Sequence, residues 1–259
     1  MNGSAQNSRA PGKYDGVLQI IRYNWSHYAF TFFVAVSCIA AGELLRSRAA
    51  SAIALLGVAL VCWMAISILA SHYIYDRSGL YDFRWMLDSL PRQPSTWLNI
   101  HCGLDQSSPL LISLFPNAKR QVLDIFDPSE MTEPSIARAR RENIAASETF
   151  AANFRALPVP SGSCAAVFLI FAAHELRNRS SRREFFAEIT RVLSTDGTVV
   201  MIEHLRDLPN FAAFGPGFLH FQSRREWIKV AASADLALVN QFSITPFVCV
   251  FMLAHKNHD

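Results

Sequence analysis

Hydrophobic residues gather in two long runs near the start of the chain. Residues 28–45 are interrupted only by Glu43, and residues 49–70 carry no charge at all. At about 1.5 Å per residue, each run approaches the length that crosses a hydrocarbon core of roughly 30 Å. Only Arg46-Ser47-Arg48 separates them, so the pattern predicts an antiparallel hairpin of two transmembrane helices over residues 28–72. Small side chains recur in both runs, which predicts close packing of the two helices.

The charges around this hairpin indicate its orientation. Lys and Arg residues lie on both outer flanks and two more lie at the tip, so the count favours both ends on the cytoplasmic side. We therefore expect an integral protein of the inner or plasma membrane whose remaining domain is cytoplasmic. Four other interpretations fit the same pattern: a buried helical pair, a cleaved signal peptide with residues 28–41 as its apolar region, a hairpin that dips into one leaflet, and a pair that packs against a partner protein.

Changes in residue type along the chain predict four segments. Residues 1–27 form a polar N-terminal segment, of which the first 12 are predicted to be disordered. The hairpin follows. Residues 73–95 mix aromatic and charged side chains and predict a linker helix at the membrane interface, which Pro91 and Pro94 close. Residues 96–259 form the remaining domain.

Shorter apolar runs fill that domain and alternate with helical patterns. Such alternation is typical of an α/β fold with a parallel sheet, and the last two runs suit an antiparallel hairpin at its edge. A helix that is rich in Ala and Arg is expected from about residue 136 to residue 151. The predicted strands are residues 96–100, 119–126, 165–172, 198–202, 236–244 and 247–254.

Composition narrows the classes of function. The chain of 259 residues is 51% hydrophobic, which suits a globular domain with a membrane element. A net charge of +3 with scattered basic residues gives no indication of nucleic-acid binding. The five cysteines are widely spaced, which predicts neither a disulfide framework nor a zinc site, and no metal ligands are predicted elsewhere.

A strand, a glycine-containing loop and a helix follow one another at residues 96–115. This arrangement binds nucleotides in many folds, because the loop exposes backbone and the helix start offers free N–H groups. The segment 97–105, with segments 122–127, 157–160 and 188–197, resembles the cofactor site of class I S-adenosylmethionine (SAM)-dependent methyltransferases. That family's acidic-x-Gly-x-Gly-x-Gly loop corresponds here to Asn99, His101, Gly103 and Asp105, so only the middle glycine is retained.

The resemblance also assigns residues to the nucleoside half of SAM. Asp124 at the end of the second strand is expected to accept both ribose hydroxyls, with Asp127 as the second candidate. Asp127 could instead cap the following helix. Asn153 takes the place of the acidic residue that holds the adenine amino group, and Phe154 could pack on the adenine ring; an ordinary loop role is the alternative for both.

Histidines follow the strands where ligands bind in a parallel sheet. His174 and Glu175 come directly after the run 165–172, and Glu203 and His204 end the run 198–202. His220 lies in a Phe-rich stretch, residues 211–221, that could form a lid or a wall for a lipid-like acceptor. Histidine suits proton transfer at neutral pH, so His174, His204 and His220 are the candidate general bases, with Glu203 orienting one of them. His174 could instead pack beside the cofactor.

Together these features predict a membrane-anchored, SAM-dependent methyltransferase. The resemblance implies a Rossmann-like, seven-stranded, mostly parallel sheet with flanking helices behind the membrane hairpin. The expected partners are the lipid bilayer and a small, lipophilic acceptor that is methylated on oxygen or nitrogen. The alternative is a non-catalytic, membrane-tethered accessory protein with a degenerate methyltransferase fold, which the loop substitutions at Asn99, His101 and Asp105 motivate.

Overall fold

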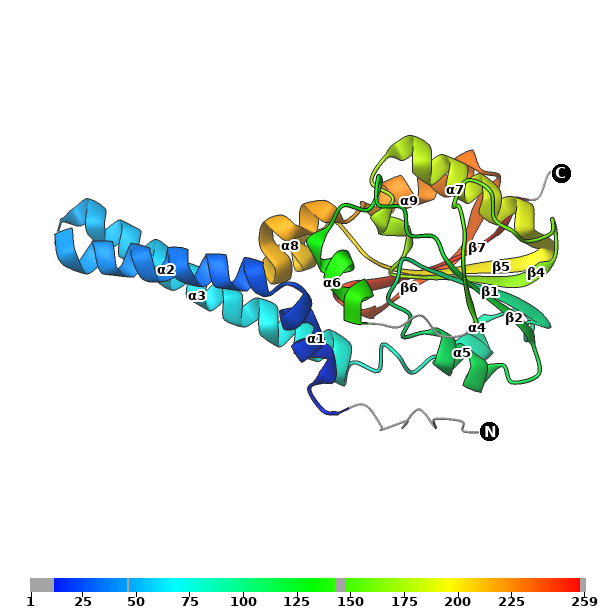
Figure 1. The fold of residues 1–259 in the computed structure, drawn as a ribbon, viewed down its shortest axis with the longest axis horizontal. Helices are drawn as coiled ribbons and strands as arrows, with labels where there is room; N and C mark the ends of the chain where they lie inside the picture. The colour runs from blue at the N-terminus through cyan, green and yellow to red at the C-terminus, as the bar shows by residue number, and fades with distance from the viewer. Residues whose placement is uncertain (1–11, 46, 143–147, 257–259) are drawn as a thin grey trace. The chain divides into compact units, whose positions relative to one another are not determined.

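A computed structural model describes residues 12–45, 47–142 and 148–256 of the chain (Figure 1). The chain divides into two compact units, Met1–Gly79 and Leu80–Asp259, which are described separately below.

Two long helices make up most of the first unit. They are α2 (Trp25–Leu45) and α3 (Arg48–His72), and Ser47 caps α3 by accepting a hydrogen bond from the N–H of Ala50 at 3.1 Å. The helices pack closely where the sequence places small residues. A Cβ added at Gly57 would lie 2.6 Å from the carbonyl oxygen of Ala35, so only glycine fits this crossing.

Both helices are long and apolar enough to cross a membrane. The candidate spans are Trp25–Leu45 and Arg48–Arg77, and only 6% of the apolar window of each is buried. A helical pair in a protein core would bury far more of its apolar surface. The structure therefore argues against the buried-pair interpretation, whereas a signal sequence passes the same test of length and composition.

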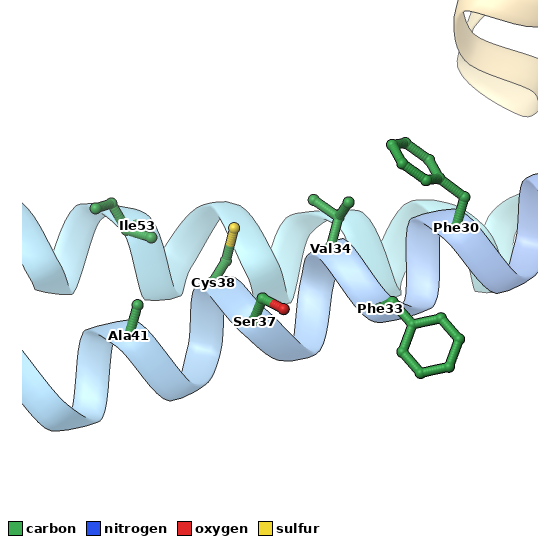
Figure 2. A pocket seen from close by; sticks show the side chains of 7 residues that line it. All are labelled: Phe30, Phe33, Val34, Ser37, Cys38, Ala41 and Ile53. Atoms are coloured by element: carbon green, nitrogen blue, oxygen red, sulfur yellow. The ribbon is translucent and has the colours of Figure 1, made fainter.

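A shallow apolar groove runs along α2. Figure 2 shows its lining, which comes from α2 except for Ile53 of α3. Phe30, Phe33 and Val34 contribute its apolar surface, as expected of a face that meets lipid acyl chains.

The N-terminal segment differs from the sequence prediction. Residues 1–11, predicted to be disordered, lie outside the described part of the chain, but α1 (Asp15–Tyr23) forms a regular helix. The carboxylate of Asp76 stabilises its start, because it accepts hydrogen bonds from the N–H groups of Gly16 and Val17 at 2.7 and 3.1 Å. The linker is not one helix either: a π-helical turn, η1 (Tyr73–Arg77), follows α3, and Gly79 takes a φ of +69°.

A seven-stranded sheet forms the second unit, with the strand order β3-β2-β1-β4-β5-β7-β6. The first five of these strands run parallel to one another. β7 runs antiparallel to both of its neighbours, β5 and β6. The predicted α/β class with a mostly parallel sheet is confirmed. The strands are β1 (Thr96–His101), β2 (Lys119–Asp124), β3 (Thr149–Ala151), β4 (Cys164–Ile170), β5 (Leu193–His204), β6 (Leu236–Thr245) and β7 (Val248–His255).

Helices cover both faces of this sheet. In Figure 1, α7 and α9 lie on one side and α4 and α5 on the other. The apolar stripe of α7 fills the core with Phe185, Phe186 and Ile189, all fully buried, and the ring of Phe186 stacks on Trp227 of α9 at 6.1 Å. The helices are α4 (Trp85–Ser89), α5 (Ser108–Leu114), α6 (Pro134–Glu142), α7 (Arg179–Val192), α8 (Leu208–Phe214) and α9 (Arg224–Ser233), with the 3-10 turns η2 (Ala173–Glu175) and η3 (Gly215–His220).

The helix predicted after the second strand is shorter than expected. It ends at Glu142 within the described residues, and residues 149–151 form strand β3 instead of its last turn. Thr149 and Phe150 are β-formers, and pairing with Val122 and Leu123 satisfies their backbone groups in the sheet.

Candidate active site

The carboxyl ends of β1, β2, β4 and β5 meet at one edge of the sheet. They place His101, Asp124 and His204 at or near the edge, and Cys102 lies between the β1 loop and the end of β4, with its Sγ 3.5 Å from the carbonyl oxygen of Ala172. Burial, and then the carboxylates of Glu175 and Asp124, raise the pKa of the Cys102 thiol. The predicted cofactor and acceptor residues therefore flank the same side chain.

The loop after β1 is held by its own side chains. Gly103 has a φ of +110°, which other residues rarely adopt, so the retained glycine is needed for the backbone itself. Asp105 accepts hydrogen bonds from the N–H groups of Ser107 and Ser108, at 3.2 and 2.9 Å, at the start of α5. Asp105, predicted to bind the cofactor, thus fixes the loop in this structure.

Two buried polar atoms in this loop have no partner among the described residues. Asn99 is fully buried and donates from Nδ2 to Asp105, Ser107 and Ser108, but its Oδ1 accepts no hydrogen bond. His101 accepts from the N–H of Gly103 at Nδ1, 3.0 Å away, which places its ring proton on Nε2, and that atom has no acceptor.

Burial lowers the pKa of His101 below its ordinary 6.5, although Asp105 and Asp124 oppose the shift, so the ring is neutral at pH 7. A free acceptor at Asn99 and a free donor at His101 match the ammonium and carboxylate groups of an amino-acid moiety. The loop therefore fits the methionine end of SAM.

The expected ribose partner is engaged by an arginine. Asp124 ends β2 as predicted, but its Oδ2 receives a hydrogen bond from Nη1 of Arg140 on α6 at 2.5 Å. The guanidinium also lies 4.2 Å from the centre of the Phe126 ring, and the Arg140 side chain covers Gly103 closely enough to exclude a Cβ there. The candidate ribose carboxylate is thus paired with Arg140 in this structure.

The remaining predicted nucleoside residues lie beside this position. Asp127 accepts from the N–H and hydroxyl of Ser129, which lowers its pKa and closes a turn before α6 rather than capping that helix. Asn153 is exposed and accepts from the N–H of Arg155 at 2.9 Å. Phe154 is 1% exposed, and the Arg155 guanidinium covers its ring at 4.2 Å, so contact with an adenine would require Arg155 to move.

A sharp turn after β4 builds the acceptor side. Phe171 has a φ of +51°, a strained conformation for a non-glycine residue, and the chain then forms the short turn η2. Glu203 on β5 is fully buried; its Oε1 accepts from the N–H groups of Ala173 and His174, at 3.0 and 3.2 Å, and its Oε2 lies 2.6 Å from Nδ1 of His174. The His174 ring is thereby fixed, as predicted for a histidine that Glu203 orients.

Glu175 and His220 complete a cluster around this ring. Nε2 of His174 lies 3.3 Å from Oε1 of Glu175, and Nε2 of His220 lies 3.6 Å from Oε2 of the same carboxylate. Burial lowers the pKa of His174, but Glu203 and Glu175 outweigh it and raise the value to about 10. Burial by itself would raise the pKa of the Glu175 carboxyl. The neighbouring His174 outweighs burial and lowers this pKa well below its ordinary value.

His204, the third candidate base, lies apart from this cluster. Its ring is stacked between Phe171 and Phe221, with centroid distances of 4.9 Å to each, and its Nδ1 lies 2.9 Å from the carbonyl oxygen of Phe247. Burial lowers the pKa of His204 to about 4, so it is neutral at pH 7. The Phe-rich stretch thus encloses His204 and carries His220 into the cluster.

Comparisons with known proteins agree with this geometry. The family described as "Methyltransferase domain" matches residues 100–201, which include the β1 loop, Asp124, His174 and most of β5. No curated protein matches the chain in sequence.

Solved structures of methyltransferases share the fold. A SAM-dependent methyltransferase from Aquifex aeolicus is 16% identical, with a TM-score of 0.53, and the match covers 68% of this chain and 91% of that one. The mitomycin 7-O-methyltransferase MmcR is 13% identical, with a TM-score of 0.55, and the match covers 95% of this chain and 74% of that one. These identities establish the fold alone.

The sheet order, the loop after β1 and the family match together implicate SAM as the cofactor. Residues 100–201 thus match the methyltransferase family model, and the second unit of the chain has the fold of solved SAM-dependent methyltransferases.

Proposed function

We propose that this protein transfers the methyl group of SAM to an oxygen or nitrogen atom of a small, apolar acceptor. The observation that carries the proposal is the fixed His174 ring, 2.6 Å from the buried Glu203, at the carboxyl ends of β4 and β5. Ligands of a parallel sheet bind at the carboxyl ends of its strands, and a fixed histidine–carboxylate pair there is typical of an active site.

When bound, SAM supplies an electrophilic methyl group on a sulfonium sulfur. Asn99 and His101 would hold its amino-acid end, and Asp124 its ribose. An acceptor that carries a proton on the methylated atom would have to lose it. The residues of the chain therefore align the acceptor, exclude water and receive that proton. Within the His174–Glu175–His220 cluster, His220 is the proposed acceptor of that proton, because a pKa of about 10 leaves His174 already protonated.

Aromatic side chains around the cluster favour an apolar acceptor. The His174 ring meets the rings of His220 and Phe221 edge-on, at 5.1 and 6.0 Å, and Phe214 lies against Phe221. Such a wall contributes dispersion and burial rather than hydrogen bonds. The structural similarity to an enzyme named for O-methylation, MmcR, is consistent with oxygen as the acceptor atom.

The hairpin is proposed to anchor the enzyme in a membrane, with the methyltransferase domain in the cytoplasm. Support comes from two apolar helices of 21 and 30 residues, in whose apolar windows only 6% is buried. Cellular SAM is cytosolic, and an apolar acceptor would partition into the same bilayer. A leader sequence at α2 is the competing interpretation, and the size of the mature protein in cells distinguishes the two.

One observation favours a different function, that of a tethered accessory protein without activity. The Arg140–Asp124 contact satisfies the ribose-binding carboxylate without any ligand. An accessory protein would keep this contact permanently, whereas an enzyme would open it when SAM arrives.

Methyl transfer from labelled SAM to organic extracts of membranes tests the proposal. We expect label in the extract with the wild-type protein and none with Asp124→Ala. His220→Ala should reduce turnover much more than it reduces SAM affinity. If SAM binding collapses in His220→Ala while turnover per bound complex stays normal, the acceptor-side role is wrong. If neither protein binds SAM, the accessory role is supported.

A further inference from the structure

Three side chains of the acceptor cluster converge as the ligands of a cation do. One nitrogen each of His174 and His220 and one carboxylate oxygen of Glu175 all lie within 4.8 Å of one another. Two ligand atoms bound to one first-row metal ion, each at about 2.1 Å, lie about 3.0 to 3.4 Å apart. Nε2 of His174 lies 3.3 Å from Oε1 of Glu175, and Nε2 of His220 lies 3.6 Å from Oε2 of the same carboxylate. The side chains would therefore have to close in on the ion from separations of up to 4.8 Å.

A second observation points to a missing partner. Oε2 of Glu175 is buried and accepts no hydrogen bond among the described residues, and Nε2 of His220 lies 3.6 Å away, beyond hydrogen-bonding distance. A buried carboxylate oxygen without a hydrogen bond is costly, because its lost hydration is not replaced. A cation between Glu175 and the two rings would remove this cost.

The groups behind the two histidines suit metal ligation. A histidine that binds a metal through Nε2 usually donates from Nδ1 to a carboxylate, which fixes the ring. Glu203 already fills this position behind His174, at 2.6 Å. Behind His220, Oε1 of Glu133 lies 3.9 Å from Nδ1, and Arg177 now donates to that nitrogen. Cation binding would shift the ring proton of His220 to Nδ1 and replace Arg177 by Glu133.

We propose that His174, Glu175 and His220 bind one divalent transition-metal ion at the acceptor side of the active site. Two imidazoles and one carboxylate favour Zn²⁺ and its neighbours in the first transition row, and disfavour Mg²⁺ and Ca²⁺, which prefer oxygen ligands. Three protein ligands leave coordination positions open, and these would take an oxygen atom of the acceptor. The site itself is independent of the proposed function, whereas its role in acceptor binding rests on that function.

Zinc titration of the full-length, untagged protein in detergent tests the site. The protein is first freed of metal and kept reduced, and Zn²⁺ is added against a chromophoric chelator. We expect one tightly bound equivalent. Glu175→Gln keeps the shape of the side chain and should weaken binding at least tenfold, as should His220→Ala. The matched control is His27→Ala, which removes an exposed histidine of α2 and should leave the affinity unchanged.

Two outcomes would overturn the site: no saturable binding by the wild-type protein, or equal affinity in all four proteins with unchanged melting temperatures. Because the titration contains no SAM, its result is separate from that of the methyl-transfer assay. Binding of Zn²⁺ without binding of SAM would support the metal site and contradict the proposed function. Binding and use of SAM without binding of Zn²⁺ would support the proposed function and contradict the metal site.

Discussion

If Asp124 binds the ribose of SAM, as proposed, Arg140 competes for its carboxylate, and removing Arg140 should strengthen cofactor binding. Nη1 of Arg140 lies 2.5 Å from Oδ2 of Asp124, and the two side chains are 32% and 11% exposed, respectively. The ion pair is therefore intermediate in burial between an exposed pair and a fully buried one. Such a pair contributes about 1 kcal/mol after solvent screening. Arg140→Ala removes this competition and should lower the Kd for SAM about fivefold. The positive guanidinium would also repel the sulfonium and ammonium groups of SAM. Its removal should therefore favour SAM binding for this second reason as well.

Calorimetric titration of SAM into the detergent-purified protein measures this effect. Arg141→Ala is the matched control, because Arg141 is the next residue of α6 and is exposed. Its Kd should equal that of the wild type. A weaker affinity in Arg140→Ala would refute the reasoning, since it would mean that Arg140 binds SAM instead of occupying its place.

Three further changes test other parts of the structure. Gly103→Ala forces a side chain into a φ of +110° and against Arg140, so SAM affinity should fall about tenfold by the same titration; an unchanged Kd would contradict the loop geometry. Burial holds the pKa of His204 near 4, below its unfolded value of about 6.5, so stability present above pH 6.5 is lost as pH falls towards 4, by up to about 3 kcal/mol. His204→Phe should flatten this part of the curve of unfolding free energy against pH, and an equally steep curve would show that other groups cause it. Gly57→Leu should separate α2 from α3 and lower the melting temperature, whereas Leu55→Ala on an exposed face should not; equal melting temperatures would argue against the close crossing.

The order of elements in the methyltransferase domain could be predicted because each strand has a strong local pattern. Residues 165–172 are uniformly apolar, as a strand covered on both faces must be, and β4 occupies most of that range. β3 was harder to predict because it has only three residues, and its stability comes from pairing with β2 rather than from its own sequence. The prediction of a single linker helix was wrong for a different reason: Gly79, at a positive φ, interrupts the helical backbone.

The site was predicted in part for the same physical reason. Asp124, His174 and Glu203 could be located because they lie at or just after strand ends, whose position in a parallel sheet is fixed by topology. Arg140 was missed, since nothing but the Arg-rich composition of its helix signals that it reaches Asp124 across the loop. The proximity of His174, Glu175 and His220 could not be predicted, because His220 lies 45 residues from Glu175 in the sequence and no ligand spacing connects them.

SAM binding by the full-length protein is the most direct test of the central claim. Calorimetry should detect one site with micromolar affinity in the wild type and no binding in Asp124→Ala, with both proteins folded by circular dichroism. Equal binding in the two proteins would contradict the assignment of Asp124 as the ribose partner. No binding to the folded wild type would contradict the proposed enzyme and favour an accessory protein whose methyltransferase fold has lost its cofactor.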